Sequence, residues 1–134
     1  MDYRKLNGTD IDVSVIAMGC WAIVGDTTWG AQDEAQSLAT IHTALDVGIN
    51  FFDTAEAYGN GYSETLLGKA LQGQRDRAVI ASKVSGANLA PADLRAACER
   101  SLERLSTDYI DFYQIHWPNR DVPLAETMGE LGRL

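Results

Sequence analysis

Short apolar runs alternate with longer amphipathic segments along the chain, which predicts strands separated by helices. The apolar runs are centred on Ile16, Ile49, Val79 and Phe112, so they recur about every 30 residues. The second run, Ile49 to Phe52, is almost continuously apolar, as a strand covered on both faces should be. Such a regular order of strand and helix is typical of consecutive βαβ units and predicts an α/β protein with a parallel sheet.

The segments between the apolar runs carry the signals of helix ends. Predicted helices open at Asp33, Ser63, Pro91 and near Pro123, which are residue types favoured at the first positions of helices. Apolar residues then follow at helical spacing, and Gly48 suits the left-handed position after the first helix. The pattern therefore predicts four strand–helix units in succession.

Two shorter strand-like segments precede the first unit. Residues 3–6 and 11–15 flank Asn7-Gly8, a dipeptide with a strong preference for hairpin turns. We therefore expect an N-terminal β-hairpin followed by about four βα units, which together make a partial TIM barrel.

Four parallel strands are too few for a closed barrel, which needs about eight. Leu134 falls inside the last predicted helix, and the first and fourth strands would be unprotected edges. We therefore expect residues 1–134 to be the N-terminal half of a longer barrel domain. Self-association through the open edges, including the pairing of two such halves, is the alternative.

The formal net charge of −8 argues against nucleic acid as a partner, because an acidic surface repels phosphate backbones and no cluster of Lys and Arg overrides it. With 46% hydrophobic and 22% charged residues, the chain has the composition of a globular protein. No apolar run approaches the ~20 residues that span a bilayer, and the N-terminus lacks the apolar segment of a signal peptide. These features predict a cytoplasmic protein that does not enter the membrane.

The cysteines and histidines do not form a metal-binding pattern. Cys20 and Cys98 lie far apart in the sequence, and no motif joins His42 to His116, so a dedicated zinc site is not expected. Cys98 and His42 fall at helical spacing with leucines, which indicates packing. Cys20 follows the first strand, where packing is the commoner role and a reactive thiol is the alternative.

Ionisable side chains end three of the four predicted parallel strands. Asp53 follows the second strand, Lys83 the third and His116 the fourth, while Tyr58 lies in the loop after Asp53. In a parallel barrel the C-terminal ends of all strands face the same mouth, which is where such barrels carry their active sites. We therefore expect these four side chains to meet at one site.

This set of residues suits the protonation of a carbonyl oxygen while a hydride reaches its carbon. A tyrosine is a weak acid at neutral pH, but a nearby lysine ammonium favours the phenolate. A carboxylate keeps the lysine charged and oriented, and a histidine across the site can hydrogen-bond the carbonyl oxygen. Tyr58 would then be the general acid, supported by Lys83, Asp53 and His116.

Each of these residues also has an ordinary structural role that must be weighed against the chemical one. Asp53 could cap its loop, Tyr58 could pack on the rim, Lys83 could extend to solvent, and His116 could be a packing histidine. Lys83 could also be the Schiff-base nucleophile of an aldolase-type barrel. A non-catalytic fragment that binds partners through its open edges is a further alternative. Two residues of the loop after the first strand could either line a pocket or pack the loop: Trp21 and Trp29.

The sequence around these residues resembles the aldo-keto reductase family. The family signature is similar to the stretch from Asp53 to Glu64, which reads D-T-A-E-A-Y-G-N-G-Y-S-E. Three further stretches fit the family in the right order, namely V-S-V-I-A-M-G-C-W, I-A-S-K-V around Lys83, and Y-I-D-F-Y-Q-I-H-W-P-N ending at Asn119. The resemblance covers essentially the whole chain. Within the family, the sequence resembles the bacterial branch that includes inositol-utilisation and general-stress reductases.

That resemblance implies a complete (β/α)8 barrel that reduces aldehydes or ketones with NADPH, with NADH as the alternative cofactor. In the family, later strands bind the phosphates and adenine of the cofactor, so little reductase activity is expected of these 134 residues alone. The catalytic residues that it implies are Asp53, Tyr58, Lys83 and His116. The residues that it places near the nicotinamide are Gly19, Cys20, Trp21 and Asp53.

Overall fold

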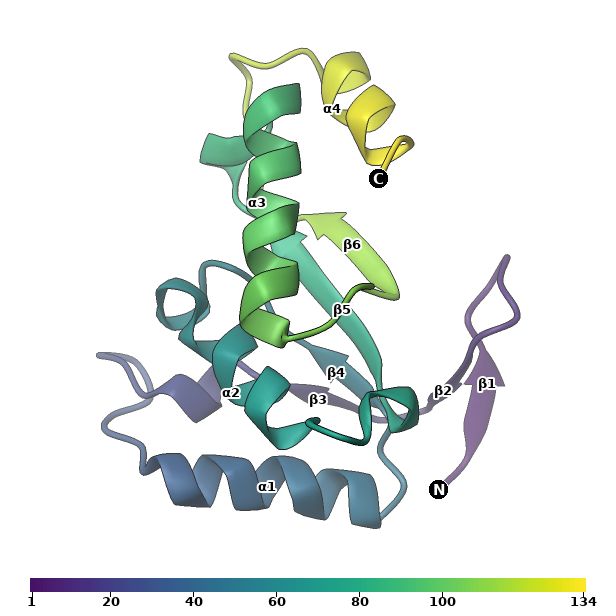
Figure 1. The fold of residues 1–134 in the computed structure, drawn as a ribbon, viewed down its shortest axis with the longest axis vertical. Helices are drawn as coiled ribbons and strands as arrows, with labels where there is room; N and C mark the ends of the chain where they lie inside the picture. Colours follow the sequence, from purple (N-terminus) through teal and green to yellow (C-terminus); the bar gives the residue numbers. More distant parts are fainter.

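A parallel four-stranded sheet forms the centre of the protein, and its strand order follows the order of the chain (Figure 1). The computed structural model describes all residues, 1–134. Each strand pairs in parallel with the next one along the chain, so every connection crosses over through a helix. The strands are β3 (Ala17–Gly19), β4 (Phe51–Asp53), β5 (Val79–Val84) and β6 (Phe112–Ile115).

A helix follows each strand of the sheet, and the helices pack on one another in chain order, α1 on α2, α2 on α3 and α3 on α4. The longest helix has 15 residues. None of the helices combines the length and the apolar character that crossing a membrane requires. The helices are α1 (Glu34–Asp46), α2 (Tyr62–Ala70), α3 (Pro91–Leu105) and α4 (Leu124–Leu131), with the 3₁₀ turns η1 (Ala22–Val24), η2 (Tyr58–Gly61), η3 (Arg75–Arg77) and η4 (Gly86–Asn88) between them.

The main core lies between the sheet and the helices α1 and α2. Ile41 on α1, Phe52 on β4, Leu66 on α2 and Ile80 on β5 are fully buried in one cluster. Phe52 and Ile80 are register partners, so both project from the face of the sheet that the helices cover. The opposite face, which carries Asp53, corresponds to the inside of a barrel. The predicted α/β class and the partial barrel are thus confirmed.

The predicted N-terminal hairpin is present as β1 (Tyr3–Lys5) and β2 (Asp12–Ser14), which pair antiparallel (Figure 1). Asn50, the residue before β4, attaches this hairpin to the parallel sheet. Its side-chain amide donates to the carbonyl of Asp12 at 2.9 Å, and its Oδ1 accepts the N–H of Ser14 at 2.7 Å. The hairpin therefore lies at the N-terminal end of the sheet, away from the strand ends that carry the ionisable residues.

The predicted helix starts are correct for α1 and wrong for α2. The carboxylate of Asp33 accepts the N–H of Gln36 at 2.9 Å and caps α1 as expected. Ser63 does not cap α2, because the helix already begins at Tyr62, and Gly61, two residues before Ser63, takes the N-cap position with a φ of 89°. The hydroxyl of Ser63 is buried and donates a hydrogen bond to the carbonyl of Cys20 instead.

The predicted ends of the last helix and of the third parallel strand also differ from the structure. α4 ends at Leu131 with Gly132 at its C-cap, so Leu134 lies outside the helix rather than within it. The third parallel strand continues through Lys83 to Val84, beyond its predicted end, because β6 pairs with it over residues 81–84. Pairing with a later strand is a tertiary effect that a local apolar pattern does not contain.

Candidate active site

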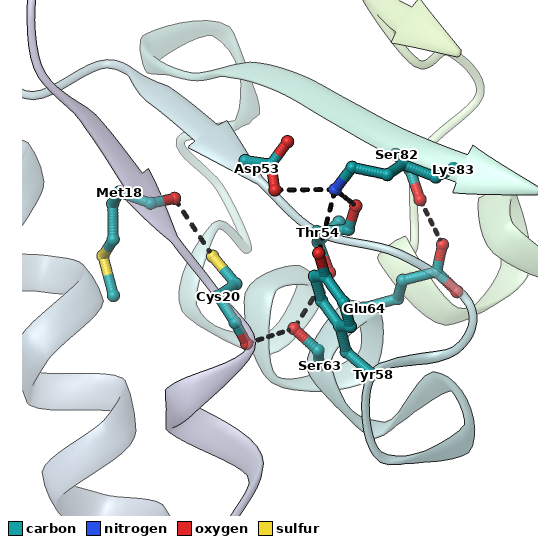
Figure 2. A network of polar contacts seen from close by, with 9 residues as sticks. All are labelled: Met18, Cys20, Asp53, Thr54, Tyr58, Ser63, Glu64, Ser82 and Lys83. Carbon is teal, nitrogen blue, oxygen red and sulfur yellow. Dashed lines mark hydrogen bonds and ion pairs between the residues drawn. The ribbon is translucent and has the colours of Figure 1, made fainter. Parts of the chain in front are cut away.

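Lys83 is the centre of a cluster at the C-terminal edge of the sheet (Figure 2). Its Nζ donates to Asp53 Oδ1 at 2.6 Å, to the carbonyl oxygen of Thr54 at 2.9 Å and to Tyr58 Oη at 3.2 Å. An ammonium has three hydrogens, so each of them has an acceptor. The lysine side chain is only 14% exposed. Lys83 is therefore held in place rather than extended to solvent.

The strand register explains why Asp53 and Lys83 meet. Asp53 pairs with Ala81, and side chains two residues apart on a strand share a face, so Asp53 and Lys83 project from the same side of the sheet. The ladder continues past the end of β4, where the N–H of Thr54 donates to the carbonyl of Ala81 at 2.8 Å and that of Glu56 donates to the carbonyl of Lys83 at 3.3 Å. The loop that leads to the tyrosine is thus fixed against the lysine strand.

A tight turn, η2, presents the phenol of Tyr58 to Lys83. Within this turn, Tyr58 is followed by Gly59, Asn60 and Gly61. Their φ values are 57°, 53° and 89°, and this run of left-handed residues reverses the direction of the chain. A side chain at Gly59 would also meet Val24 at 3.0 Å. Because an ammonium only donates, the phenol oxygen must be the acceptor in its bond with Lys83. The phenol hydrogen is then left free for another partner.

His116 lies beside the tyrosine on the other side of the site. Its ring makes an edge contact with Tyr58 at 5.5 Å between centroids and stacks on Trp117 at 3.5 Å. Burial, and then the positive charge of Lys83, lower the pKa of His116 below its ordinary value of 6.5. Its Nδ1 is buried and has no hydrogen-bond partner within the chain. A neutral imidazole at this place can donate one N–H to a carbonyl oxygen.

The lowered pKa of His116 predicts a pH-dependent stability. The folded protein binds this proton less tightly than the unfolded chain does, so the free energy of unfolding should be highest above about pH 6.5. It should decrease as the pH falls through about 6.5 towards the lowered pKa. Urea unfolding at a series of pH values measures this. His116→Gln is expected to remove the decrease and His42→Gln to keep it; the reverse pattern would contradict the assignment.

Two tryptophans extend the aromatic surface outward from Tyr58. The indole of Trp21 stacks on the Tyr58 ring at 5.9 Å, and Trp29 contacts Trp21 edge-on at 5.6 Å. Asp26 organises this loop, because its carboxylate accepts the indole N–H of Trp21 at 2.9 Å and the backbone N–H groups of Thr28 and Trp29. Both tryptophans are exposed, so they line the mouth next to the phenol.

Gly19 and Cys20, which the family resemblance places near a cofactor, differ in what they can contact. Cys20 is fully buried, its backbone N–H donates to the carbonyl of Asp53, and its carbonyl accepts from Ser63. Burial, with the Asp53 charge as a second cause, raises the pKa of its thiol to about 12, which argues against a reactive role. Gly19 is exposed, and a Cβ there would meet nothing within 4 Å. Gly19, at the end of β3, and Trp21, in the loop that follows, are therefore exposed, whereas Cys20 between them is buried.

The structure also contains site features that the sequence reasoning missed. The carbonyl of Thr54 is an acceptor for Lys83, and no local sequence signal marks a backbone acceptor. Glu64, on the first turn of α2, is fully buried and bonded to Ser82 and Arg104. Its burial on the first turn of an amphipathic helix, next to a serine, has no signature in a single sequence. No group of three or more His, Cys, Asp or Glu side chains is placed to hold a metal ion.

A parallel sheet with crossover helices and a cluster of ionisable side chains at its C-terminal edge is the arrangement of a (β/α)-barrel protein. The model of the aldo/keto reductase family matches residues 15–134, and the chain belongs to this family. The resemblance inferred from the motifs is thereby confirmed.

Relatives and solved structures agree with this assignment. The chain is 45% identical to the aldo-keto reductase YhdN of Bacillus subtilis over 95% of its own length and 41% of that protein. A thermostable aldo-keto reductase, Tm1743, in complex with the inhibitor epalrestat is 37% identical, with a TM-score of 0.91 over 99% of this chain and 49% of that one. An aldo-keto reductase from Klebsiella pneumoniae in complex with NADPH is 37% identical, with a TM-score of 0.83 over 92% and 42% of the two chains. The chain thus spans about two fifths of the length of YhdN and less than half of the two solved chains.

Proposed function

We propose that residues 1–134 supply the proton-donating half of an aldo/keto reductase that reduces aldehydes or ketones to alcohols with NADPH, NADH being the alternative. The observation that carries this proposal is the lysine of the cluster, whose Nζ lies 3.2 Å from the Tyr58 oxygen and 2.6 Å from Asp53. A tyrosine with a free hydroxyl hydrogen and a lysine behind its oxygen is built to give up a proton. Membership of the family supports the assignment.

In the proposed reaction Tyr58 donates its phenol proton to the carbonyl oxygen as the carbonyl carbon is reduced. Lys83 stabilises the negative charge that develops on the phenol oxygen, because its ammonium already donates to that atom. Asp53 accepts a hydrogen bond from the ammonium and keeps it pointed into the site. His116, neutral because its pKa is lowered, donates an N–H to the carbonyl oxygen and orients it towards Tyr58. The product is the alcohol, with its new O–H hydrogen taken from the tyrosine.

The residues at the mouth fit the nicotinamide end of the cofactor. Gly19 leaves open space at the end of β3, Trp21 presents an exposed indole, and the Asp53 side chain is 37% exposed although it is paired with Lys83. These three residues are therefore proposed to contact the nicotinamide, and Cys20 is proposed to contribute through its place in the loop, since its side chain is buried. When bound, the reduced nicotinamide supplies the hydride.

The aldolase alternative is not favoured by the geometry of Lys83. A Schiff-base lysine must attack as a neutral amine, which requires an environment that disfavours the ammonium. Lys83 instead forms an ion pair with Asp53 at 2.6 Å and donates to two further oxygens. All three amine hydrogens are used in these contacts, and an ammonium that donates three hydrogen bonds has no lone pair with which to attack a carbonyl.

A hybrid enzyme tests the proposed function. Residues 1–134 would replace the equivalent N-terminal part of the Bacillus subtilis relative YhdN, which is 45% identical over this region. The hybrid is expected to consume NADPH in the presence of a small aldehyde, as followed by the nicotinamide absorbance, and to form the alcohol. A folded hybrid that binds NADPH but forms no alcohol from any of a panel of aldehydes and ketones would contradict the proposal.

The 134 residues alone are expected to have little reductase activity, because they provide no residues assigned to the phosphates or adenine of the cofactor. The purified chain should oxidise NADPH with an aldehyde at no more than about a hundredth of the hybrid's rate, a loss typical of incomplete positioning. Turnover at the hybrid's rate would overturn this expectation.

A non-catalytic role for the chain is the second candidate, because β3 and β6 each pair on one side only and leave two open edges. This alternative predicts a self-associated chain in sedimentation together with a hybrid that does not turn over. A monomeric chain and an active hybrid would exclude it.

A further inference from the structure

Glu64 is a fully buried carboxylate behind the acid–base cluster, on the first turn of α2. Its Oε1 accepts a hydrogen bond from Ser82 Oγ at 2.6 Å, and its Oε2 accepts one from Arg104 Nη1 at 3.1 Å. Burying a charge is costly unless it is paired and hydrogen-bonded. The Glu64 carboxylate therefore links α2 to β5 through Ser82 and to α3 through Arg104.

The bond to Ser82 connects Glu64 to the strand that carries Lys83. Ser82 and Lys83 are consecutive on β5, so their side chains leave the strand on opposite faces. Figure 2 shows the two sets of contacts, in which Glu64 reaches Ser82 and the Lys83 amine reaches Asp53 and Tyr58. The carboxylate thus fixes β5 from the outside, one residue before the lysine.

The ion pair with Arg104 connects Glu64 to the turn that carries Tyr58. The Arg104 side chain, which comes from α3, lies directly against Gly61, where an added Cβ would be 2.4 Å from its Nε. Gly61 is the last residue of η2, and Tyr58 is the first. Arg104 therefore contacts both the Glu64 carboxylate and the turn, so the ion pair links the turn to Glu64.

The neighbouring residue, Ser63, forms hydrogen bonds with the segments that follow β3 and β4. Its hydroxyl accepts from Thr54 Oγ1 at 2.9 Å and donates to the carbonyl of Cys20 at 2.7 Å. Thr54 is also the residue whose carbonyl oxygen accepts from Lys83. The first turn of α2 thus contacts the ends of three strands and every segment that gives Lys83 an acceptor.

We propose that Glu64 is a positioning residue, which holds Lys83 through Ser82 and the Tyr58 turn through Arg104 at the separation needed for the lysine to donate to the phenol oxygen. That the contact between Lys83 and Tyr58 serves catalysis rests on the proposed function. The positioning itself is a property of the chain and is measured without cofactor or substrate.

The reactivity of the Lys83 amine tests the proposal in the 134-residue chain. Acetic anhydride at low concentration modifies accessible amines, and peptide mass spectrometry gives the rate for each lysine. Lys83 is 14% exposed, against 57% for Lys5 and 50% for Lys69, so these two serve as internal references. Glu64→Gln is expected to raise the relative rate of Lys83 about ten-fold, which corresponds to the loss of one charge-assisted hydrogen bond.

Glu130 provides a matched control. It is also a buried glutamate with two arginine partners, Arg95 and Arg133, but it lies on α4 and touches none of the cluster. Glu130→Gln should therefore leave the Lys83 rate unchanged, within about two-fold, whatever it costs in stability. An equal rise in both variants would show that lost stability alone exposes the lysine, and would overturn the proposal.

Two further measurements keep the test decisive if Glu64→Gln folds poorly. Ser82→Ala leaves the ion pair with Arg104 intact and should raise the Lys83 rate about three-fold, the effect of one neutral hydrogen bond. The fully bonded Lys83 ammonium should also give a slowly exchanging signal in a ¹H–¹⁵N spectrum, retained in Glu130→Gln and lost in Glu64→Gln. An unchanged rate and signal in both Glu64→Gln and Ser82→Ala would overturn the positioning role and leave the proposed reductase function untouched, since neither measurement depends on turnover.

Discussion

Replacing Tyr58 with phenylalanine in the hybrid enzyme is expected to lower kcat by about 10²–10⁴-fold, the usual contribution of a positioned general acid. Phenylalanine keeps the ring that stacks on Trp21 and contacts His116, so the change removes only the hydroxyl. The KM for the aldehyde should change little, because the proton is transferred in the reaction and not in binding. Steady-state kinetics with a simple aldehyde give both constants.

Tyr62 is the matched control for this prediction. It lies four residues further along the chain, is exposed, and donates its hydroxyl to Glu34 at 2.5 Å on the surface. Tyr62→Phe should leave kcat within about two-fold of the parent hybrid, since surface substitutions away from a site have small effects. A similar loss in both variants, or the same kcat for Tyr58→Phe as for the parent, would remove Tyr58 from the role of acid.

Truncating Phe52 to alanine is expected to destabilise the chain by about 3–5 kcal/mol, the usual cost of removing a buried aromatic ring. Phe52 is fully buried on the central strand β4 and belongs to the main core together with residues of both α1 and α2. This loss is a large part of the ~5–15 kcal/mol by which domains are stable, so the variant should unfold at much lower urea concentrations.

Phe112 is the comparison for Phe52. It starts the edge strand β6 and is 39% exposed, so Phe112→Ala should cost about 1 kcal/mol, as for a typical partly exposed site. Equilibrium urea unfolding of the two variants beside the parent measures the difference. Equal losses would contradict the assignment of the main core to the helix-covered face of the sheet.

Much of the architecture follows from regularities that a single sequence contains. The strand centres recur at even intervals, and Asp53, Lys83 and His116 each fall at the end of a parallel strand or directly after it. Parallel pairing brings those ends to one edge whatever the details of the loops. This is why the meeting of Asp53 and Lys83 could be predicted from the sequence. Tyr58 lies in a loop, so its contact with Lys83 also depends on the η2 turn.

The rest depended on contacts between distant residues. Ser63 looks like a helix cap in the sequence, but Gly61 can adopt a positive φ and starts the helix earlier, which frees the serine for Cys20 and Thr54. Glu64 looks like an exposed first-turn acid, and only the packing of α3 brings Arg104 over it. Polar groups that satisfy one another inside a protein leave no periodic pattern in its sequence.

The order of the strands also bears on how the chain emerges from the ribosome. β3, β4, β5 and β6 are neighbours in the order in which they are synthesised, so each new strand finds its partner already made. Folding can therefore advance one βα unit at a time, and no strand has to wait for a later one to set its register. At every stage one exposed edge is β3 and the other is the strand most recently completed. We expect the nascent chain to be most dependent on chaperones in the interval between one strand and the arrival of the next.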